Sequence, residues 1–271
     1  MSSTLISELL ANGPVVTDGA WGTRLKEAGL ASGTCPDEWN LSHAEAVEAV
    51  PQAYVAAGSQ IVLTNTFRAN RLALEDYGLA DRVQSINLAG GQISRRAAGA
   101  QARVFGSIGP SGKMLFAGQV TAEALEAAFC EQAEALAESG VDGLVVETMS
   151  DLEEAQLALR AAQKTGLPTV VCMVFDTGKD LDRIMTGRTP EQVAEQLTAA
   201  GADVIGANCG QGIASYVTIC QRLHASTPQP IWIKANAGVP QVVDEQVVYE
   251  TTADQFAAHG PDLVAAGASF L

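Results

Sequence analysis

A short pattern recurs along the chain: a helical segment ends in Ala or Ser followed by Gly, and a short apolar run comes next. The copies are AAGSQIVLTNTF at Gly58, ESGVDGLVVETM at Gly140, AAGADVIGANCG at Gly201 and AAGASFL at Gly267. A Gly just past a helix end usually closes the helix in the left-handed conformation. A short run of branched apolar residues bounded by turns is typical of a buried strand. Helix followed by strand, repeated, predicts a parallel α/β sheet.

The rest of the chain supplies further strands, with helical patterns between them. The predicted strands are Val15–Ala20, Ile61–Phe67, Val104–Pro110, Gly143–Met149, Thr169–Asp176, Val204–Gly210, Ile231–Asn236 and Ala268–Leu271. Capping boxes begin three of the helices, at Ser150, Thr189 and Thr252. Eight strands with seven helical regions fit a (β/α)8 TIM-type barrel, with its eighth strand at the chain end. A doubly wound sheet is the alternative, but Gly19-Ala-Trp-Gly22 does not match its phosphate-binding turn.

Composition narrows the class of protein and its partners. Hydrophobic residues make up 47% of the chain and aromatic residues only 5%, which suits a parallel sheet covered by Ala-rich helices. A net charge of −15, with no basic cluster, disfavours nucleic acids and anionic membranes as partners. No apolar run approaches the length of a bilayer span. An odd number of Cys and no hydrophobic leader predict a cytoplasmic protein. We expect one barrel domain over residues 1–271, cut short before its final helix.

Polar residues gather where the predicted strands end, and the carboxyl ends of barrel strands carry the active site. Asp18 and Glu147 each follow apolar residues there, and together they could hold a substrate ammonium group. The alternative is that each carboxylate caps a neighbouring backbone N–H. Cys209 ends the sixth predicted strand, where a thiolate could be a nucleophile, a metal ligand or an inert buried thiol.

The other cysteines and the histidines offer no second site of this kind. Cys130 and Cys220 fall in predicted helices, Cys172 in mid-strand and Cys35 in a loop, so we expect them to be structural. No histidine falls at a strand end, which argues against a His-centred triad or a His-rich metal site. The three are His43 and His259 in helical segments and His224 near a helix end. The chain has no P-loop and no dinucleotide-binding motif.

At these strand ends the sequence resembles the homocysteine S-methyltransferase family, over essentially the whole chain. The matching motifs, in order, are Asp18-Gly-Ala-Trp-Gly-Thr23, Cys35-Pro-Asp-Glu-Trp-Asn-Leu41-Ser42, Thr64-Asn-Thr-Phe67-Arg-Ala-Asn70, Glu147-Thr148, Gly206-Ala-Asn208-Cys209 and Asn236-Ala-Gly238. Each motif alone is weak, but their shared order is specific.

The resemblance implies a (β/α)8 barrel that methylates the thiol of homocysteine, forming methionine. It also implies a zinc ion held by Cys209 and by a Gly-Gly-Cys-Cys pair after the eighth strand. That pair would begin where the chain ends, so the remaining ligands are expected beyond Leu271. By resemblance, Cys209 and Asn236 are the catalytic residues, with Asn236 near the zinc. The implied substrate-binding residues are Asp18, Gly19, Thr64, Phe67, Glu147 and Asn208.

The methyl donor stays open at this point, as do two other functions. Betaine-like and methylsulfonium donors would need only this barrel, whereas methylcobalamin or methyltetrahydrofolate would need a corrinoid protein or domain as partner. One alternative function is a metal-free barrel that acts as a binding or partner module. The other is a Schiff-base aldolase using Lys234, which shares a strand face with Trp232 and Asn236.

Overall fold

The structure is a computed structural model, and it describes residues 4–239, 241–243, 246–249 and 251–271. The chain divides into two compact units, and each is described by itself. The N-terminal unit comprises Val15–Val146 and Glu153–Thr169. The C-terminal unit comprises Met1–Pro14, Glu147–Leu152 and Val170–Leu271. The expectation of one domain over residues 1–271 stays a prediction.

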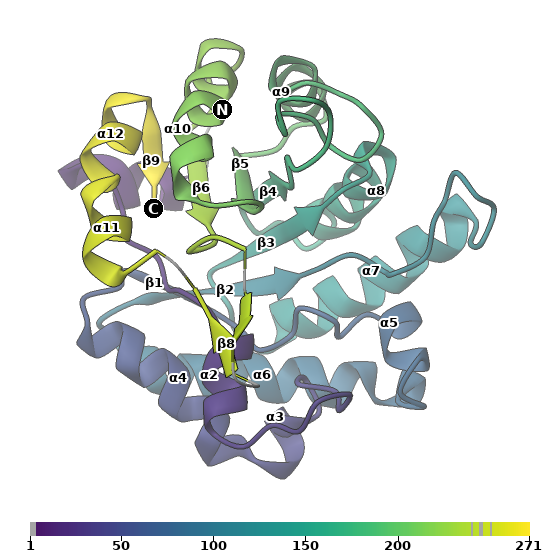
Figure 1. Ribbon diagram of the computed structural model, residues 1–271. Helices are drawn as coiled ribbons and strands as arrows, with labels where there is room; N and C mark the ends of the chain where they lie inside the picture. Colours follow the sequence, from purple (N-terminus) through teal and green to yellow (C-terminus); the bar gives the residue numbers. More distant parts are fainter. Residues whose placement is uncertain (1–3, 240, 244–245, 250) are drawn as a thin grey trace. The chain divides into compact units, whose positions relative to one another are not determined.

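In the N-terminal unit, parallel strands follow the order β1-β2-β3 (Figure 1). Their bounds are Ile61–Leu63 for β1, Arg103–Ile108 for β2 and Gly143–Met149 for β3, whose last residues belong to the C-terminal unit. The helices of this part of the chain are α2 (Gly22–Glu27), α3 (Trp39–Ser42), α4 (Ala44–Ala56), α5 (Arg71–Glu75), η2 (Ala80–Arg82), α6 (Val83–Ala98), α7 (Ala122–Glu138) and α8 (Leu152–Gln163).

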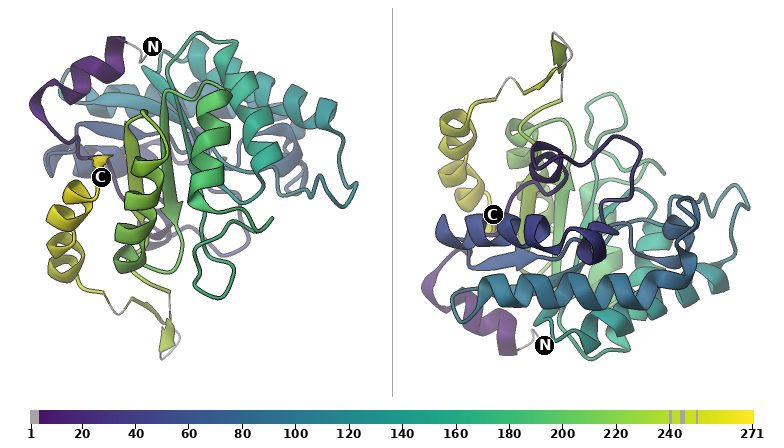
Figure 2. Two further views of the ribbon diagram at one scale, coloured as in Figure 1. Left: turned by 90° about the horizontal axis from the view of Figure 1, so that it is seen from above. Right: turned by 90° about the horizontal axis from the view of Figure 1, so that it is seen from below.

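In the C-terminal unit, parallel strands follow the order β4-β5-β6-β9. Their bounds are Thr169–Met173 for β4, Val204–Cys209 for β5, Ile231–Ala235 for β6 and Ala268–Phe270 for β9. The other elements are α1 (Thr4–Leu9), η1 (Leu10–Asn12), α9 (Pro190–Ala199), α10 (Ile213–Ala225), β7 (Gln241–Val243), β8 (Gln246–Val248), α11 (Ala253–Ala258) and α12 (Gly260–Ala265). Figure 2 shows α11 and α12 following one another toward β9 and the C-terminus.

The recurring Gly pattern does what the sequence predicts. Gly58, Gly140, Gly201 and Gly267 have φ of 101°, 84°, 85° and 105°, a region that favours glycine. Each lies two residues past a helix end, with a strand shortly after it: α4 then β1, α7 then β3, α9 then β5, and α12 then β9. The helix-to-strand alternation, and hence the α/β class with parallel strands, is confirmed.

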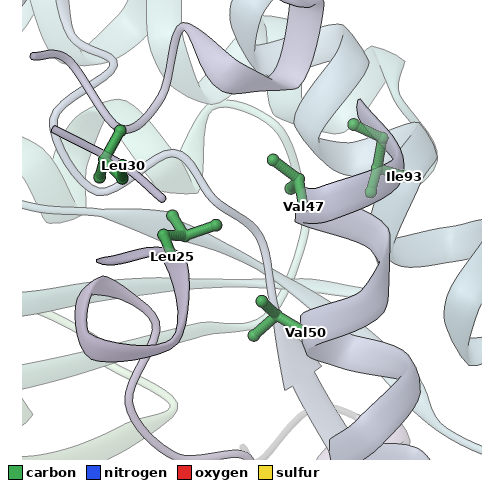
Figure 3. Packing of buried hydrophobic residues seen from close by; sticks show 5 residues of the cluster. All are labelled: Leu25, Leu30, Val47, Val50 and Ile93. Carbon is green, nitrogen blue, oxygen red and sulfur yellow. The ribbon is translucent and has the colours of Figure 1, made fainter. Parts of the chain in front are cut away.

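Each unit has an apolar core of its own. In the N-terminal unit, buried side chains from α2, α4, α6 and the loop after α2 form one cluster. Figure 3 shows its members, Leu25, Leu30, Val47, Val50 and Ile93. In the C-terminal unit, Trp232 of β6 stacks on Phe270 of β9 with ring centroids 5.1 Å apart, and both rings are buried. This stacking holds β9 against β6.

Two details of the predicted strand set are wrong. Val15–Ala20 is not a strand: its Thr17 makes an isolated parallel bridge to Ile61, so the described residues form seven parallel strands rather than eight. The predicted strand Ile61–Phe67 ends at Leu63. Beyond it Asn65 donates to Pro36 O and Thr66 to Ser107 O, so local partners replace a sheet ladder.

The segment after β6 adds two strands that the sequence analysis did not name. β7 and β8 form an antiparallel pair before the predicted helix, which begins at the Thr252 cap as α11. In the described part of the chain, no helix is long and apolar enough to cross a membrane.

Candidate active site

The ends of β3 and β5 bring together Glu147, Thr148, Asn208 and Cys209, all in the C-terminal unit. The Asn208 side chain joins them. Its Nδ2 donates to Thr148 Oγ1 at 2.7 Å and lies 3.3 Å from Glu147 Oε2 and 3.4 Å from Cys209 Sγ. Its Oδ1 accepts the backbone N–H of Thr148 at 2.7 Å. Three predicted site residues therefore form one hydrogen-bonded cluster with a fourth residue, Thr148, that the sequence analysis did not assign.

The backbone of this cluster is unusual at two neighbouring points. Thr148 and Cys209 both have φ of 61°, in the left-handed region that non-glycine residues seldom adopt. Such conformations cost about 1 to 3 kcal/mol each and persist where the surroundings enforce them, often at active sites. The Thr148 hydroxyl and the Cys209 sulfur lie 3.5 Å apart.

The environment of Cys209 keeps its thiol protonated. Burial raises the pKa of Cys209, and the negative charge of Glu147 raises it further, while the hydrogen bond from Thr148 and the charge of Lys234 lower it. The net direction is upward. Positive charge beyond that of Lys234 would therefore be needed to make this sulfur a thiolate at neutral pH, because positive charge favours the ionised form.

Residues behind the cluster hold the loop after Cys209. The buried Tyr216 hydroxyl of α10 donates to Asn208 O at 2.8 Å, and a Cβ at Gly210 would lie 2.5 Å from its oxygen, so only glycine fits there. Asn236 donates its backbone N–H to Cys209 O at 3.1 Å and its Nδ2 to Gly210 O at 3.2 Å. Asn236 therefore holds the backbone after Cys209, and its predicted place near a zinc ion stays a prediction.

Lys234 lies on β6 opposite Asn208 in the register of β5 and β6. It is half-buried and interacts electrostatically with Cys209. The positive charge of Lys234 therefore lies close to the cluster of Glu147, Thr148, Asn208 and Cys209.

A cavity of about 490 Å³ lies beside the loop that follows Cys209. Its lining includes the beginning of α10, at Gly212, Ile213 and Ser215, together with Gly238 and His259. None of the predicted site residues lines it, although Gly212 and Gly238 follow Cys209 and Asn236 closely in the chain.

The N-terminal unit holds the other predicted site residues. Asp18, which is 4% exposed, accepts from Trp21 Nε1 and from the backbone N–H of Leu63, both at 2.8 Å. Thr64 accepts from Ser107 N at 3.0 Å and lies 2.6 Å from the Thr66 hydroxyl. The Asp18 carboxylate thus caps the backbone N–H of Leu63 at the end of β1, which is the alternative role that the sequence analysis gave it.

Gly19 and Phe67 occupy tight positions in the same unit. A Cβ on Gly19 would lie 2.8 Å from the Tyr54 hydroxyl oxygen, so the Tyr54 ring requires glycine there. Phe67 is half-buried, and its carbonyl accepts from Gly109 N at 2.9 Å. That Asp18, Gly19, Thr64 and Phe67 share a substrate site with Cys209 stays a prediction.

Asp37, in the Cys35–Ser42 motif, is a buried carboxyl that the sequence analysis did not single out. It is 2% exposed and accepts from the backbone N–H of Arg68 at 3.0 Å and from the Cys35 thiol. Burial raises its pKa from the ordinary 3.8 to about 6. A carboxylate inside a motif otherwise rich in loop-forming residues was the signal that could have identified it.

The remaining cysteines and histidines lie where they were expected, with one correction. Cys130 is on α7, Cys172 on β4, Cys220 on α10 and Cys35 in a loop, and all are free thiols. His43 and His259 lie at helix boundaries rather than within helices, because Ala44 and Gly260 begin new helices after them. Among the described residues, no three His, Cys, Asp or Glu side chains gather as a metal site would require.

Comparison with known proteins agrees with the motif order. The sequence model of homocysteine S-methyltransferases matches residues 15–271. The methionine synthase of Mycobacterium leprae is 28% identical over 272 residues, which cover 94% of this chain and 22% of that protein. The betaine–homocysteine S-methyltransferase 1 of Sus scrofa is 32% identical over 211 residues, covering 75% of this chain and 74% of that protein.

A solved structure shows the same fold. The homocysteine methyltransferase MmuM of Escherichia coli, in its metallated form, has a TM-score of 0.81 with this chain. The two are 22% identical, and the match covers 98% of this chain and 93% of that one.

Proposed function

Because the chain belongs to the homocysteine S-methyltransferase family, we propose that it transfers a methyl group to the thiol of homocysteine and so forms methionine. The observation that carries this proposal is the cluster in which the Asn208 amide contacts both the Glu147 carboxylate and the Cys209 thiol. An aminothiol has an ammonium group that a carboxylate can bind and a sulfur that can lie beside the Cys209 thiol. The named activities of the methionine synthase and betaine–homocysteine methyltransferase relatives support the same acceptor.

In this proposal Glu147 accepts hydrogen bonds from the ammonium group of homocysteine. Its carboxylate is 8% exposed, and a buried carboxylate is stabilised by a cationic partner. Asp18 is the second carboxylate for the same ammonium group. Gly19, Thr64 and Phe67 line the acceptor site, and Asn236 holds the loop that follows Cys209.

We also propose that Cys209 is one ligand of a zinc ion. Its thiol is a soft donor of the kind zinc prefers, and the metallated form of the Escherichia coli enzyme supports a metal. The described residues fit this group in part, because they supply this one thiol and no complete metal site. When bound, zinc would supply positive charge that deprotonates a coordinating thiol.

The proposed reaction is a displacement at the methyl carbon. The acceptor thiol releases its proton to solvent, and a C–S bond then forms between its sulfur and the methyl carbon. The bond from the methyl group to the donor breaks, leaving its electron pair on the donor. Betaine-like or methylsulfonium donors would approach the chain directly. A methylated corrinoid would instead be carried by a separate protein or domain. The methionine synthase relative, of whose length this chain spans 22%, supports a donor of this kind.

We propose that the chain is a (β/α)8 barrel as one domain, with Val15–Ala20 in the position of the first strand through its bridge at Thr17, and with its last strand at the chain end. The alternation of parallel strands with helices in both units supports this, as does the likeness to the Escherichia coli enzyme. We further propose a cytoplasmic location, which the free thiols support.

The test is methionine formation, measured by mass spectrometry with homocysteine and each donor in turn: a methylsulfonium, betaine and methylcobalamin. The Cys209→Ala variant should lose about 100-fold or more in rate. The Cys130→Ala variant, altered on α7 of the N-terminal unit, is the matched control and should keep its rate. Wild-type protein that, with zinc present in excess, neither binds homocysteine nor methylates it would overturn the proposal. A borohydride-trapped adduct on Lys234 would favour the aldolase alternative instead.

A further inference from the structure

The Asn208 amide is fully engaged by protein atoms. A primary amide has two N–H donors and one carbonyl acceptor. Its Oδ1 is used by the Thr148 N–H, and its Nδ2 faces Thr148 Oγ1, Glu147 Oε2 and Cys209 Sγ. Three acceptors therefore surround two protons. An amide in this position acts through its neighbours rather than by binding a substrate itself.

The Thr148 hydroxyl links the amide to the thiol. Its oxygen accepts from Asn208 Nδ2 at 2.7 Å, the shortest contact of that nitrogen. The same oxygen lies 3.5 Å from Cys209 Sγ, a normal distance for a hydrogen bond that involves sulfur, and either group can be its donor. This contact ties the position of the Cys209 sulfur to the Thr148 hydroxyl.

The backbone conformation makes this arrangement specific to Thr148. A β-branched residue with positive φ is an outlier, and Thr148 has φ of 61°. The left-handed turn at the end of β3 lets both the N–H and the hydroxyl of one residue face Asn208. Cys209 makes the same turn at the end of β5, which presents its sulfur to the hydroxyl.

We propose that Thr148 and Asn208 are positioning residues that fix the Cys209 sulfur relative to the Glu147 carboxylate. The inference rests on the proposed function, in which Glu147 binds the ammonium end of the acceptor and Cys209 lies at its sulfur end. Since one amide nitrogen contacts both groups, the pair sets the separation that the acceptor must span. Homocysteine has one more methylene than cysteine between these ends, so the same contacts select the acceptor by length.

The test compares Thr148→Ser with Thr148→Gly. Both replacements relieve or tolerate the left-handed backbone, glycine more readily, so both are expected to fold, and only serine keeps the hydroxyl. A misplacement of about 1 Å costs roughly 100-fold in rate. We therefore expect the glycine variant to lose about 10- to 100-fold in kcat, with its KM for the methyl donor unchanged. The serine variant should keep most of the wild-type kcat.

A second readout needs no turnover. Calorimetric titration of wild type and Asn208→Ala with homocysteine and with cysteine measures selection by length. We expect the ratio of homocysteine affinity to cysteine affinity to fall about tenfold in Asn208→Ala. Circular dichroism checks that the variant is folded. Equal kcat in the serine and glycine variants, or an unchanged preference in the alanine variant, would overturn this inference alone. Wild-type protein without homocysteine binding or methylation, with zinc present in excess, would overturn the proposed function and this inference with it.

Discussion

Asp37 is a buried carboxyl whose ionisation the fold opposes. Its carboxyl is 2% exposed, and burial raises its pKa from 3.8 to about 6. The backbone N–H of Arg68 and the charge of the Arg68 side chain lower the pKa, but less than burial raises it. Between about pH 4 and pH 6 the folded protein therefore binds more protons at Asp37 than the unfolded chain does.

This difference predicts how the free energy of unfolding depends on pH. The contribution of Asp37 is most favourable below its unfolded pKa and declines as pH rises through its folded pKa. The Asp37→Asn variant keeps an oxygen that can accept from Arg68 N–H and does not titrate. We expect the free energy of unfolding of this variant, minus that of wild type, to increase by about 2 kcal/mol between pH 4.5 and pH 7.5. Urea unfolding at both pH values measures this, and a constant difference would contradict the raised pKa.

At this scale, the sequence predicts residue types better than it predicts their roles. Glu147 and Cys209 were identified because polar residues at strand ends meet at one edge of a parallel sheet, and Asn208 was assigned through the family resemblance. The role of Thr148 depends on a positive φ, which nothing in a Glu-Thr pair signals. Burial of Asp37 depends on contacts with Arg68, which lies in another motif and is brought near by the fold.

Helix α9 illustrates how local sequence fixes an element. Thr189 accepts from the Gln192 N–H, the Gln192 side chain accepts from the Thr189 N–H, and Pro190 occupies the first turn. These contacts satisfy backbone donors that a helix end leaves unpaired. The same reciprocal pair begins α11, at Thr252 and Gln255.

We expect Thr189→Ala to lower the free energy of unfolding by about 1 kcal/mol, because the Gln192 N–H loses its acceptor. Glu195→Ala, at an exposed position on the same helix, is the matched control and should change stability by less than about 0.5 kcal/mol. Denaturant unfolding of the two variants gives the comparison. Equal losses would mean that the cap contributes nothing specific.

Elements whose limits depend on distant partners were predicted less well. The Gly-closed helices and the strands after them follow from local signals, and β3 has the predicted bounds Gly143–Met149. Val15–Ala20 carries the same apolar signal but makes only one bridge, at Thr17. The antiparallel strands β7 and β8 follow β6 in a segment for which the sequence analysis predicted no element. Periodicity detects an apolar segment, whereas pairing decides whether it becomes a strand.

For the molecule as a whole, we expect the 271 residues to bind zinc weakly. A stable tetrahedral site needs three or four protein ligands. In the C-terminal unit Cys172 and Cys220 are fully buried, and the Cys220 thiol donates to Leu263 O. A Cβ at Gly206 would lie 2.8 Å from Cys172 Sγ, so that sulfur packs on the sheet. Cys209 is the half-buried thiol of this unit.

Metal analysis after dialysis against buffered zinc checks this expectation. We predict well below one tightly bound zinc per chain, and less still in Cys209→Ser. A full equivalent that survives a chelator would mean that the ligands are misassigned. Methyl transfer at the full rate after chelation would instead argue against a role for metal in the proposed reaction.

The carboxylate of Glu147, in the C-terminal unit, is the group that we propose binds the ammonium group of homocysteine. A charge-assisted hydrogen bond contributes about 1.5 to 3 kcal/mol, or roughly 10- to 100-fold in affinity. Removing the charge of this side chain should therefore weaken homocysteine binding by that factor.

Calorimetric titration of wild type and Glu147→Gln with homocysteine measures this contribution. Glutamine keeps a side-chain oxygen but carries no charge, so we expect about a 10- to 100-fold loss in affinity. Asp18→Asn is tested separately in the same way. Asparagine keeps an oxygen that can accept from Trp21 Nε1 and Leu63 N–H, so the structural contacts of Asp18 are retained. Unchanged affinity in either folded variant would remove that residue from the proposed acceptor site, because a carboxylate that binds the ammonium group cannot lose its charge without weakening the complex.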